Sequence, residues 1–398
     1  MTRTVHRAAA ALAIAASILA VAGCGPQSVA EARQTRAASG TGDLVIGAPW
    51  PWAAGEDEGI LYRKGLEMGV DEVNARGGVH GRRLRLLFED DQQSVNEGLR
   101  IAQRLISNPD VIAVIGHLQS YVSVPTSAIY ENGEVVMLSP FSTDPALTAN
   151  GFEHVFRMTF TDQETGRRMA EHAARQGYRR VAIYYVRTEY GRGLANAFEE
   201  RAGEVGIGVA ARASYDAVAR FEARAFEPTL RQWKLIDVDA IFLAGEIPVA
   251  GHLIAEMRRM GLTQPILGGD AMSFPALIAA AGPAAEGTVV AASFHSAERR
   301  PEVARFAKEF RARNHTEPDP AAAVAYDAVH ALARAMEGAE APTAGSVAAR
   351  LRSLPPMEGV TGRISFDKRG DLVGDKLVKL VVRNGRFEPL PDSAPPRR

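Results

Sequence analysis

Polar residues follow two apolar runs in the first part of the chain. Ser120 follows the run 111–116 and opens a predicted helix. Phe141, Ser142 and Thr143 follow the next such run. Because helix N-termini carry free N–H groups and partial positive charge, both segments could offer N–H groups and hydroxyls to one anion. Serine and threonine are also frequent helix caps, so a purely structural role is the alternative for Ser120 and Thr143.

Acidic and aromatic residues follow later apolar runs. Asp270 comes after the run 264–268 and could accept hydrogen bonds from an ammonium, or it could be a solvated loop residue. Glu246 comes after the run 238–245, and its carboxylate could bind a cationic or hydroxylated ligand group, share an ammonium with Asp270, or point to solvent. Tyr190 begins a predicted helix and could line a cleft or pack at a lobe surface.

Two tryptophans, Trp50 and Trp52, stand in the loop after the first apolar run. They could form the wall of a pocket for a ligand side chain, or they could cover the edge of a lobe. Phe141 would narrow such a pocket. A buried carboxylate without a partner is costly. We therefore expect the ligand to place a polar or cationic group near Glu246, or Glu246 to lie at a wet rim.

Motifs for catalysis are absent from the sequence. It contains no P-loop, no dinucleotide-binding fingerprint after the first predicted strand and no Gly-x-Ser-x-Gly elbow. Its nine histidines lack the spacing of metal ligands. His117 is interpreted as a structural histidine that precedes a helix. The sequence therefore predicts no enzymatic activity, cofactor or metal.

The elements that must position these residues alternate along the chain. Runs that predict strands lie at 43–48, 83–90, 111–116, 135–139, 180–186, 238–245, 264–268, 287–293 and 376–383. Stretches with helical periodicity lie at 56–76, 94–107, 161–176, 190–205, 222–235, 249–260, 301–314 and 320–335. This alternation predicts an α/β fold with parallel sheets and helices on both faces. Because the order restarts near residue 161, two such units are expected.

Bulk properties agree with an exported two-lobe protein. The net charge of −1 and the mixture of basic and acidic residues argue against nucleic-acid binding. The roughly 350 residues after position 42 exceed one compact core and suffice for two lobes. The Pro- and Arg-rich tail, residues 391–398, is predicted to be disordered.

The N-terminus has the layout of an export signal. Arg3 and Arg7 precede an apolar stretch at 8–22 that is short for a membrane span. Residues 21–24, Val-Ala-Gly-Cys, resemble the lipobox of bacterial lipoproteins, and Cys24 is the only cysteine. The resemblance implies a signal peptide at 1–23, a lipid on Cys24, and a lipidated flexible tether at 24–42. The alternative is an ordinary secretory signal with a chance cysteine.

Several short motifs, taken in order, resemble the leucine/isoleucine/valine-binding branch of type I periplasmic binding proteins. These are 74–81 (Asn-Ala-Arg-Gly-Gly-Val-His-Gly), 113–117 (Ala-Val-Ile-Gly-His), 143–148 (Thr-Asp-Pro-Ala-Leu-Thr), 155–157 (Val-Phe-Arg), 190–194 (Tyr-Gly-Arg-Gly-Leu), 267–270 (Leu-Gly-Gly-Asp), 284–287 (Ala-Ala-Glu-Gly) and 325–328 (Ala-Tyr-Asp-Ala). The resemblance implies two doubly wound parallel-sheet lobes joined by a three-strand hinge. Lobe 1 would comprise 43–160 and 294–363, and lobe 2 would comprise 161–293 and 364–390.

The resemblance also implies a function. The chain would be the extracytoplasmic, lipid-anchored solute-binding protein of an ABC importer, a monomer that closes on an amino acid and docks on a membrane permease. Ser120 and Thr143 would hold the α-carboxylate, Asp270 the α-ammonium, and Tyr190 would line the cleft. Glu246 replaces an aromatic residue of the branched-chain binders. The alternatives are a sensory binding protein of the same fold, an envelope enzyme, and a binder of an amide, a urea or an aromatic acid.

Overall fold

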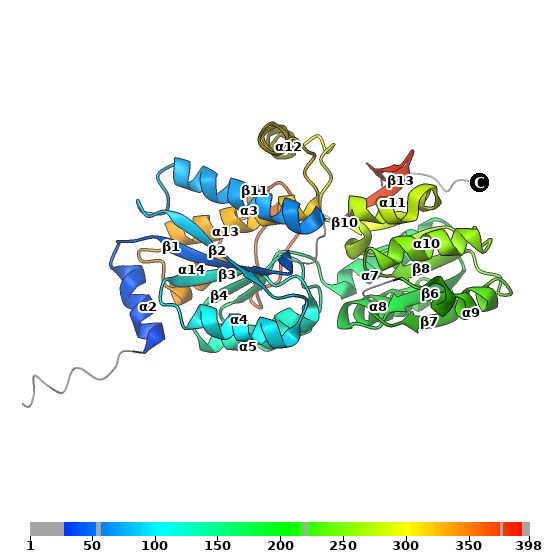
Figure 1. The fold of residues 1–398 in the computed structure, drawn as a ribbon, viewed down its shortest axis with the longest axis horizontal. Helices are drawn as coiled ribbons and strands as arrows, with labels where there is room; N and C mark the ends of the chain where they lie inside the picture. The colour runs from blue at the N-terminus through cyan, green and yellow to red at the C-terminus, as the bar shows by residue number, and fades with distance from the viewer. Residues whose placement is uncertain (1–27, 53–56, 218–220, 375–376, 392–398) are drawn as a thin grey trace, which may run out of the picture.

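The computed structural model describes residues 28–52, 57–217, 221–374 and 377–391. Within these ranges the chain forms two α/β lobes that lie side by side (Figure 1). The predicted signal peptide at 1–23, Cys24 and the tail after residue 391 lie outside the described residues.

Lobe 1 is built on a parallel sheet. Its five described strands have the order β2-β1-β3-β4-β5. They are β1 (Leu44–Trp50), β2 (Leu84–Asp90), β3 (Val111–Ile115), β4 (Val136–Ser139) and β5 (Val155–Arg157). The helices of this lobe are α2 (Val29–Ala38), α3 (Asp57–Ala75), α4 (Val95–Ile106), α5 (Ser120–Asn132), α6 (Ala146–Ala149), α12 (Pro301–Asn314), α13 (Pro320–Glu337) and α14 (Ala344–Arg352). A short hairpin of β11 (Met357–Gly359) and β12 (Gly362–Ile364) completes it.

Close packing of α3 against α13 covers one face of this sheet. Gly65 lies at the crossing point, where a Cβ atom would stand 2.3 Å from the Ala322 carbonyl oxygen. Asp319 caps α13 by accepting from the Ala322 N–H at 2.9 Å, and Pro320 occupies the first turn, where no donor is needed. These residues therefore fix where α13 begins and how closely it approaches α3.

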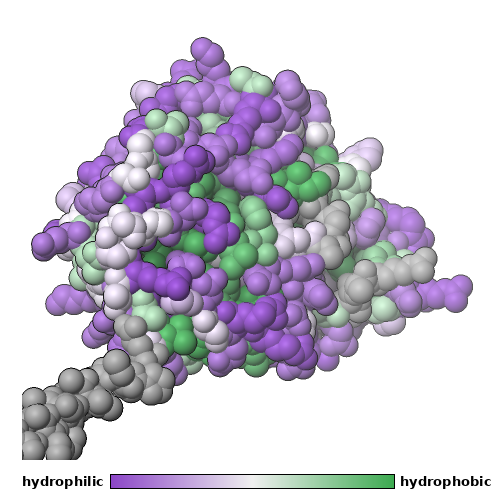
Figure 2. Space-filling view, turned by 60° about the vertical axis from the view of Figure 1, so that its left-hand side comes forward, coloured by the Kyte–Doolittle hydropathy of each residue, from purple (hydrophilic) through white to green (hydrophobic). Residues whose placement is uncertain are grey.

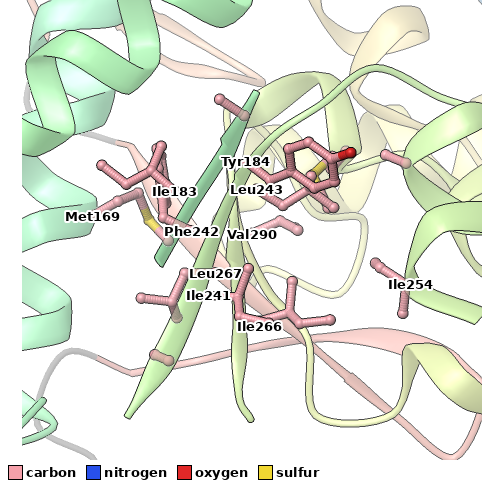
Figure 3. Close-up of a cluster of buried hydrophobic side chains, with 14 of the residues drawn as sticks. Met169, Ile183, Tyr184, Ile241, Phe242, Leu243, Ile254, Ile266, Leu267 and Val290 are labelled. Carbon is pink, nitrogen blue, oxygen red and sulfur yellow. The ribbon is translucent and has the colours of Figure 1, made fainter. Parts of the chain in front are cut away.

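Lobe 2 has a larger and mixed sheet. Its seven described strands have the order β14-β13-β10-β9-β8-β6-β7. They are β6 (Arg180–Val186), β7 (Gly208–Tyr215), β8 (Ala240–Ala244), β9 (Ile266–Gly268), β10 (Val289–Ala292), β13 (Val378–Arg383) and β14 (Arg386–Pro389). The helical segments are α7 (Asp162–Arg175), α8 (Glu189–Glu204), α9 (Ala223–Trp233), α10 (Val249–Arg259), η2 (Asp270–Met272), α11 (Pro275–Ala281) and η3 (Gly282–Ala285). Figure 3 shows the core, with Met169 of α7 and Ile254 of α10 on opposite sides of the strands.

The prediction of an α/β fold with two lobes is confirmed, and two details differ. The last two strands of lobe 2 run antiparallel to their neighbours, whereas an all-parallel sheet was expected. A two-residue turn joins them, and Asn384 and Gly385 both have positive φ there. Such Asn-Gly turns match the twist of paired strands. The prediction also missed the strands β5, β7, β11, β12 and β14 and the helices α6, α11 and α14. In β7, exposed and half-buried residues follow no simple alternation.

Three segments cross between the lobes. Met158 packs in the core of lobe 1 and Phe160 against that of lobe 2, and the chain returns between Ala292 and Phe294. The third crossing lies between Leu372 and Leu377. Residues 364–372 therefore belong to lobe 1, which corrects the predicted boundary at 363.

A buried arginine explains the position of that third crossing. The fully buried Arg157 guanidinium donates to Asp371 Oδ1 at 2.8 Å, and the Arg157 N–H donates to the Gly370 carbonyl at 2.9 Å. A buried charge without a partner is costly, so the segment that carries Asp371 stays beside lobe 1.

The prediction of a flexible tether at 24–42 is wrong for its described part. Residues 29–38 form helix α2, with a capping box between Ser28 and Glu31. Arg33 is 2 % exposed and donates to the carbonyl oxygens of Val111 at 2.6 Å, Ile106 at 2.6 Å and Gly133 at 2.5 Å. The segment therefore docks on lobe 1. Its Ala-, Gln- and Arg-rich composition suits a helix as well as a linker. The buried Arg33 side chain stabilises the docked helix.

Candidate functional site

The carboxyl ends of strands from both sheets meet at one cavity of about 480 Å³ between the lobes. Ligands of open α/β sheets bind at these strand ends. Lobe 1 contributes residues that follow β1, β3 and β4, and lobe 2 contributes residues that follow β6, β8 and β9. The lining includes the predicted residues Trp50, Ser120, Phe141, Thr143, Tyr190, Glu246 and Asp270.

The lobe 1 wall presents donors. Ser120 is the first residue of α5, so its N–H group has no partner within the helix. Its hydroxyl accepts weakly from the Asp144 N–H at 3.4 Å. The Thr143 hydroxyl is buried, and the carboxyl of Asp162 lies beside it. An anion placed between Ser120 and Thr143 could therefore accept from both residues.

Arg157 holds the loop that carries Thr143. Its guanidinium donates to the carbonyl oxygens of Ser142 at 2.8 Å and Asp144 at 2.9 Å. These bonds flank Thr143 on both sides, so the position of the threonine is set by a side chain outside the cavity. In the sequence, Arg157 stands out only as the last residue of the Val-Phe-Arg motif at 155–157, which indicates no role for it.

The lobe 2 wall presents a carboxylate. Asp270 begins η2, and the Tyr190 hydroxyl donates to its Oδ1 at 3.2 Å. The same hydroxyl accepts from the Ala271 N–H at 3.3 Å. Burial raises the pKa of Asp270 to about 6, although backbone N–H groups and the Tyr190 hydroxyl oppose that shift. A ligand cation beside Asp270 would therefore lower this pKa toward its ordinary value.

A second carboxylate lies on the same lobe. Glu246 follows β8, is partly buried, and accepts from the Thr188 hydroxyl at 3.0 Å. Thr188 in turn caps α8 by accepting from the Gly191 N–H at 3.2 Å. Burial raises the pKa of Glu246, and the Thr188 hydrogen bond acts in the opposite direction. Glu246 thus lines the cavity, and its carboxylate is held by Thr188, the N-cap residue of α8.

Aromatic rings form much of the remaining wall. Trp50 stacks on Tyr62 with ring centroids 3.9 Å apart and meets the Phe141 ring edge-on at 5.9 Å. Phe141 also meets Phe274 of lobe 2 at 6.1 Å. Because Phe141 and Phe274 come from different lobes, this pair helps to close one side of the cavity.

Two predicted site residues point elsewhere. Ser142 is fully buried in lobe 1, where its hydroxyl donates to Ser123 Oγ at 2.5 Å. Trp52 is absent from the cavity lining, packs edge-on against Phe88 at 5.2 Å, and covers the edge of the lobe. Side chains alternate in direction along this segment, so Ser142 points into lobe 1 while Phe141 and Thr143 face the cavity.

His117 belongs to a buried network behind the lobe 1 wall. Its ring nitrogens lie 2.6 Å from Asp91 Oδ2 and 3.1 Å from the Tyr130 hydroxyl oxygen. Its carbonyl accepts from the Ser123 hydroxyl at 3.3 Å. This agrees with its interpretation as a structural residue, because all these partners support the turn that leads to Ser120.

Other residues near the site were not predicted. Asp162, the first residue of α7, is buried and lies beside the Thr143 hydroxyl, which opposes the rise of its pKa. Burial raises its pKa well above the usual range, and the nearby Asp270 adds to that effect. Gly193 allows this arrangement, because a Cβ atom there would stand 2.9 Å from Asp162 Oδ2. The Tyr-Gly-Arg-Gly motif at 190–193 was the available signal.

The described lining of the cavity carries no Lys, Arg or His side chain. Among the described residues, no three His, Cys, Asp or Glu side chains form a group suited to a metal ion. No helix in those same ranges is long and apolar enough to cross a membrane. The face shown in Figure 2 is mainly hydrophilic, with hydrophobic residues in patches between the polar ones.

Curated relatives cover most of the chain. A protein of Brucella abortus (strain 2308) described as "Leu/Ile/Val-binding protein homolog 2" is 31% identical over 333 residues, which is 83% of this chain and 87% of the relative. A Pseudomonas aeruginosa protein described as "Amino acid binding protein" is 28% identical over 353 residues, which is 88% of this chain and 93% of that protein.

Solved structures share the fold. An ABC transporter substrate-binding protein from Desulfitobacterium hafniense in complex with Leu is 38% identical, with a TM-score of 0.78, over 87% of this chain and 100% of that one. The branched-chain amino acid transporter substrate binding protein LivJ from Streptococcus pneumoniae, in complex with isoleucine, is 27% identical, with a TM-score of 0.79, over 87% of this chain and 98% of that one. The family model described as "Periplasmic binding protein" matches residues 53–378. This chain therefore belongs to the periplasmic binding protein family.

Proposed function

We propose that this protein is the extracytoplasmic solute-binding subunit of an ABC importer and captures an amino acid between its lobes. The observation that carries the proposal is the placement of Ser120 and Thr143 on one wall of the cavity and Asp270 on the other. Relatives that bind leucine or isoleucine support it. The closed, loaded form would then dock on a membrane permease, and the protein would perform no catalysis.

The two ends of an α-amino acid match the two walls. Its carboxylate would accept from the free N–H groups at the start of α5 and from the hydroxyls of Ser120 and Thr143. Its ammonium would donate to Asp270, whose pKa is raised by burial and would be lowered by a cation beside it. Because the walls come from different lobes, a ligand that bridges them favours the closed arrangement.

An aromatic acid fits this cavity less well. A structure from R. palustris in complex with benzoate shares the fold at 19% identity and a TM-score of 0.76. In the present chain, a lone carboxylate would meet Glu246 and Asp270 without any Lys, Arg or His in the described lining. The charge of the cavity therefore favours a ligand that carries an ammonium.

Thermal shift and calorimetry with purified protein test the proposal. At a concentration 100 times its dissociation constant, a ligand stabilises the protein by roughly 2.7 kcal/mol. We expect at least one L-α-amino acid to bind, and the matched amino alcohol and α-hydroxy acid to bind more weakly. Failure of all twenty L-amino acids, or equal binding of an analogue that lacks the ammonium, would refute the proposal.

We also propose that the protein is anchored by a lipid on Cys24, which lies outside the described residues. The support is the sequence of residues 21–24 and the position of the sole cysteine after an apolar stretch. Radiolabelled palmitate should enter the wild-type protein in its native host and should be absent from Cys24→Ala. A wild-type protein without label would contradict this anchor.

A further inference from the structure

The cavity holds more negative charge than an ordinary amino acid can neutralise. Glu246 and Asp270 line it, and no Lys, Arg or His side chain does so in the described structure. A zwitterionic ligand brings one ammonium and one carboxylate. The ammonium would pair with Asp270, and the carboxylate would be served by the N-terminus of α5. Glu246 would then remain without a cation.

The position of Glu246 is fixed. One of its carboxylate oxygens accepts from the Thr188 hydroxyl, and its backbone carbonyl accepts from the Ala250 N–H at 2.9 Å in the first turn of α10. Its second carboxylate oxygen makes no hydrogen bond with the described residues. A solvated surface acid would not be held in this way, so the carboxylate is available to a group inside the cavity.

Hydroxyls and rings surround the same end of the cavity. Tyr215 is 6 % exposed and lines the cavity, and its hydroxyl lies beside the backbone N–H of Glu246. The hydroxyl is also close to the preceding residue, since a Cβ atom on Gly245 would stand 2.8 Å from the tyrosine oxygen. Tyr121 contributes a second phenol to the lining. The phenol oxygens of Tyr121 and Tyr215 can accept hydrogen bonds from a cation that pairs with Glu246.

We propose that the preferred ligand is a basic amino acid whose side-chain cation binds Glu246 among the rings of Tyr121 and Tyr215. This rests on the proposed function and deepens it by naming the side-chain class. An apolar side chain of similar length would leave the Glu246 carboxylate partly desolvated and unpaired, which is costly. A side-chain ammonium or guanidinium would satisfy that carboxylate and would leave the cavity close to neutral.

The test compares ligands that differ in one group. L-lysine and L-norleucine share a four-carbon stem, and only lysine carries the terminal ammonium. Calorimetry should show that lysine or arginine binds about 30-fold or more tightly than norleucine, since a buried charge pair of this kind is worth roughly 2 kcal/mol or more. High salt should reduce the affinity difference between lysine and norleucine less than it would if the ion pair were exposed to solvent.

Two variants assign the preference to one carboxylate. Glu246→Gln keeps the shape of the side chain and should remove most of the lysine advantage, because lysine loses its ion pair while norleucine binds as tightly as to the wild type or more tightly. Glu189→Gln removes a nearby charge on the exposed first turn of α8, outside the cavity lining, and should leave both affinities unchanged. Norleucine binding that is no weaker than in the wild type shows that each variant is folded.

The outcomes separate this inference from the proposed function. Tight binding of leucine or norleucine with weaker binding of lysine, arginine and ornithine would overturn the inference and leave amino-acid capture standing. A lysine preference that survives Glu246→Gln would equally overturn it. If no α-amino acid binds, the proposed function itself fails.

Discussion

Replacement of Asp270 by asparagine should change ligand affinity and stability in opposite directions. The variant keeps the size of the side chain and removes its charge. In the complex, the ligand ammonium would lose its ion pair and keep one amide acceptor. Removal of one partner from a buried pair costs roughly 3–5 kcal/mol. Because asparagine still accepts a hydrogen bond, we expect the lower end, about 3 kcal/mol, which is roughly a 100- to 200-fold weaker dissociation constant.

In the empty protein the same substitution should be stabilising at alkaline pH. The pKa of Asp270 is raised from 3.8 to about 6, so the folded protein holds this proton more tightly than the unfolded chain does. The ionised carboxylate therefore destabilises the fold above pH 6, by at most about 3 kcal/mol for a shift of this size. This penalty shrinks as the pH falls from about 6 to 3.8, and it is absent below 3.8.

Calorimetry and thermal unfolding of Asp270→Asn and the wild type, at pH 8 and pH 4, measure both effects. The empty variant should melt at a higher temperature than the wild type at pH 8, and the difference should vanish near pH 4. Wild-type affinity should fall as the pH drops through about 6, where a proton competes with the ligand ammonium, and the variant should lack that step. Wild-type affinity in the variant, or a lower melting temperature at pH 8, would refute the role given to Asp270.

Further predictions concern the other residues of the site and the docked helix. Ser120→Ala should weaken ligand binding by about tenfold. A hydrogen bond to a charged group is worth roughly 1.5–3 kcal/mol, and the lower end applies because the α5 N–H groups still bind the carboxylate. Ser142→Ala is the control and should leave the affinity unchanged in the same titration. Tyr190→Phe removes the donor to Asp270 Oδ1, so the step in affinity near pH 6 should move to higher pH; an unmoved step would contradict that contact. Arg33→Ala should lower the free energy of unfolding by about 2–4 kcal/mol because three carbonyl groups lose a buried donor, and limited proteolysis should then cut within 29–42. Arg36→Ala breaks only an exposed ion pair with Asp110 and serves as its control, with an expected loss below about 1 kcal/mol.

Most of the fold could be predicted because its signals are local. Apolar runs and helical periodicity marked the strands and helices that carry Ser120, Tyr190 and Asp270. Whether a residue faces the cavity was less predictable. Ser142 turns into lobe 1 although both of its neighbours face the ligand cavity. Such a result depends on the exact path of the loop after β4, which Arg157 holds from the neighbouring strand β5.

The missed features depend on contacts between distant segments. Asp371 lies in lobe 1 because it pairs with Arg157, far away in the sequence. Asp162 contributes to the electrostatics of the site through its proximity to Asp270, which no local pattern in either segment reveals. The helix around Arg33 forms where composition alone suggested a linker, since its stability comes from carbonyl groups of β3 and the loops beside it.

The docked helix α2 has a mechanical consequence. Four peptide units separate Cys24 from Ser28, where the described chain begins, and they span at most roughly 14 Å when fully extended. With the proposed lipid on Cys24, the start of α2 at Ser28 would stay within that distance of the bilayer, and lobe 1, on which α2 docks, would lie next to it. Lobe 1 would then be the stationary half of the molecule, and opening of the cleft would swing lobe 2 relative to the membrane. A long, freely rotating linker would instead let either lobe face the bilayer, so with this anchor the buried guanidinium of Arg33 would keep lobe 1 nearer to the membrane than lobe 2.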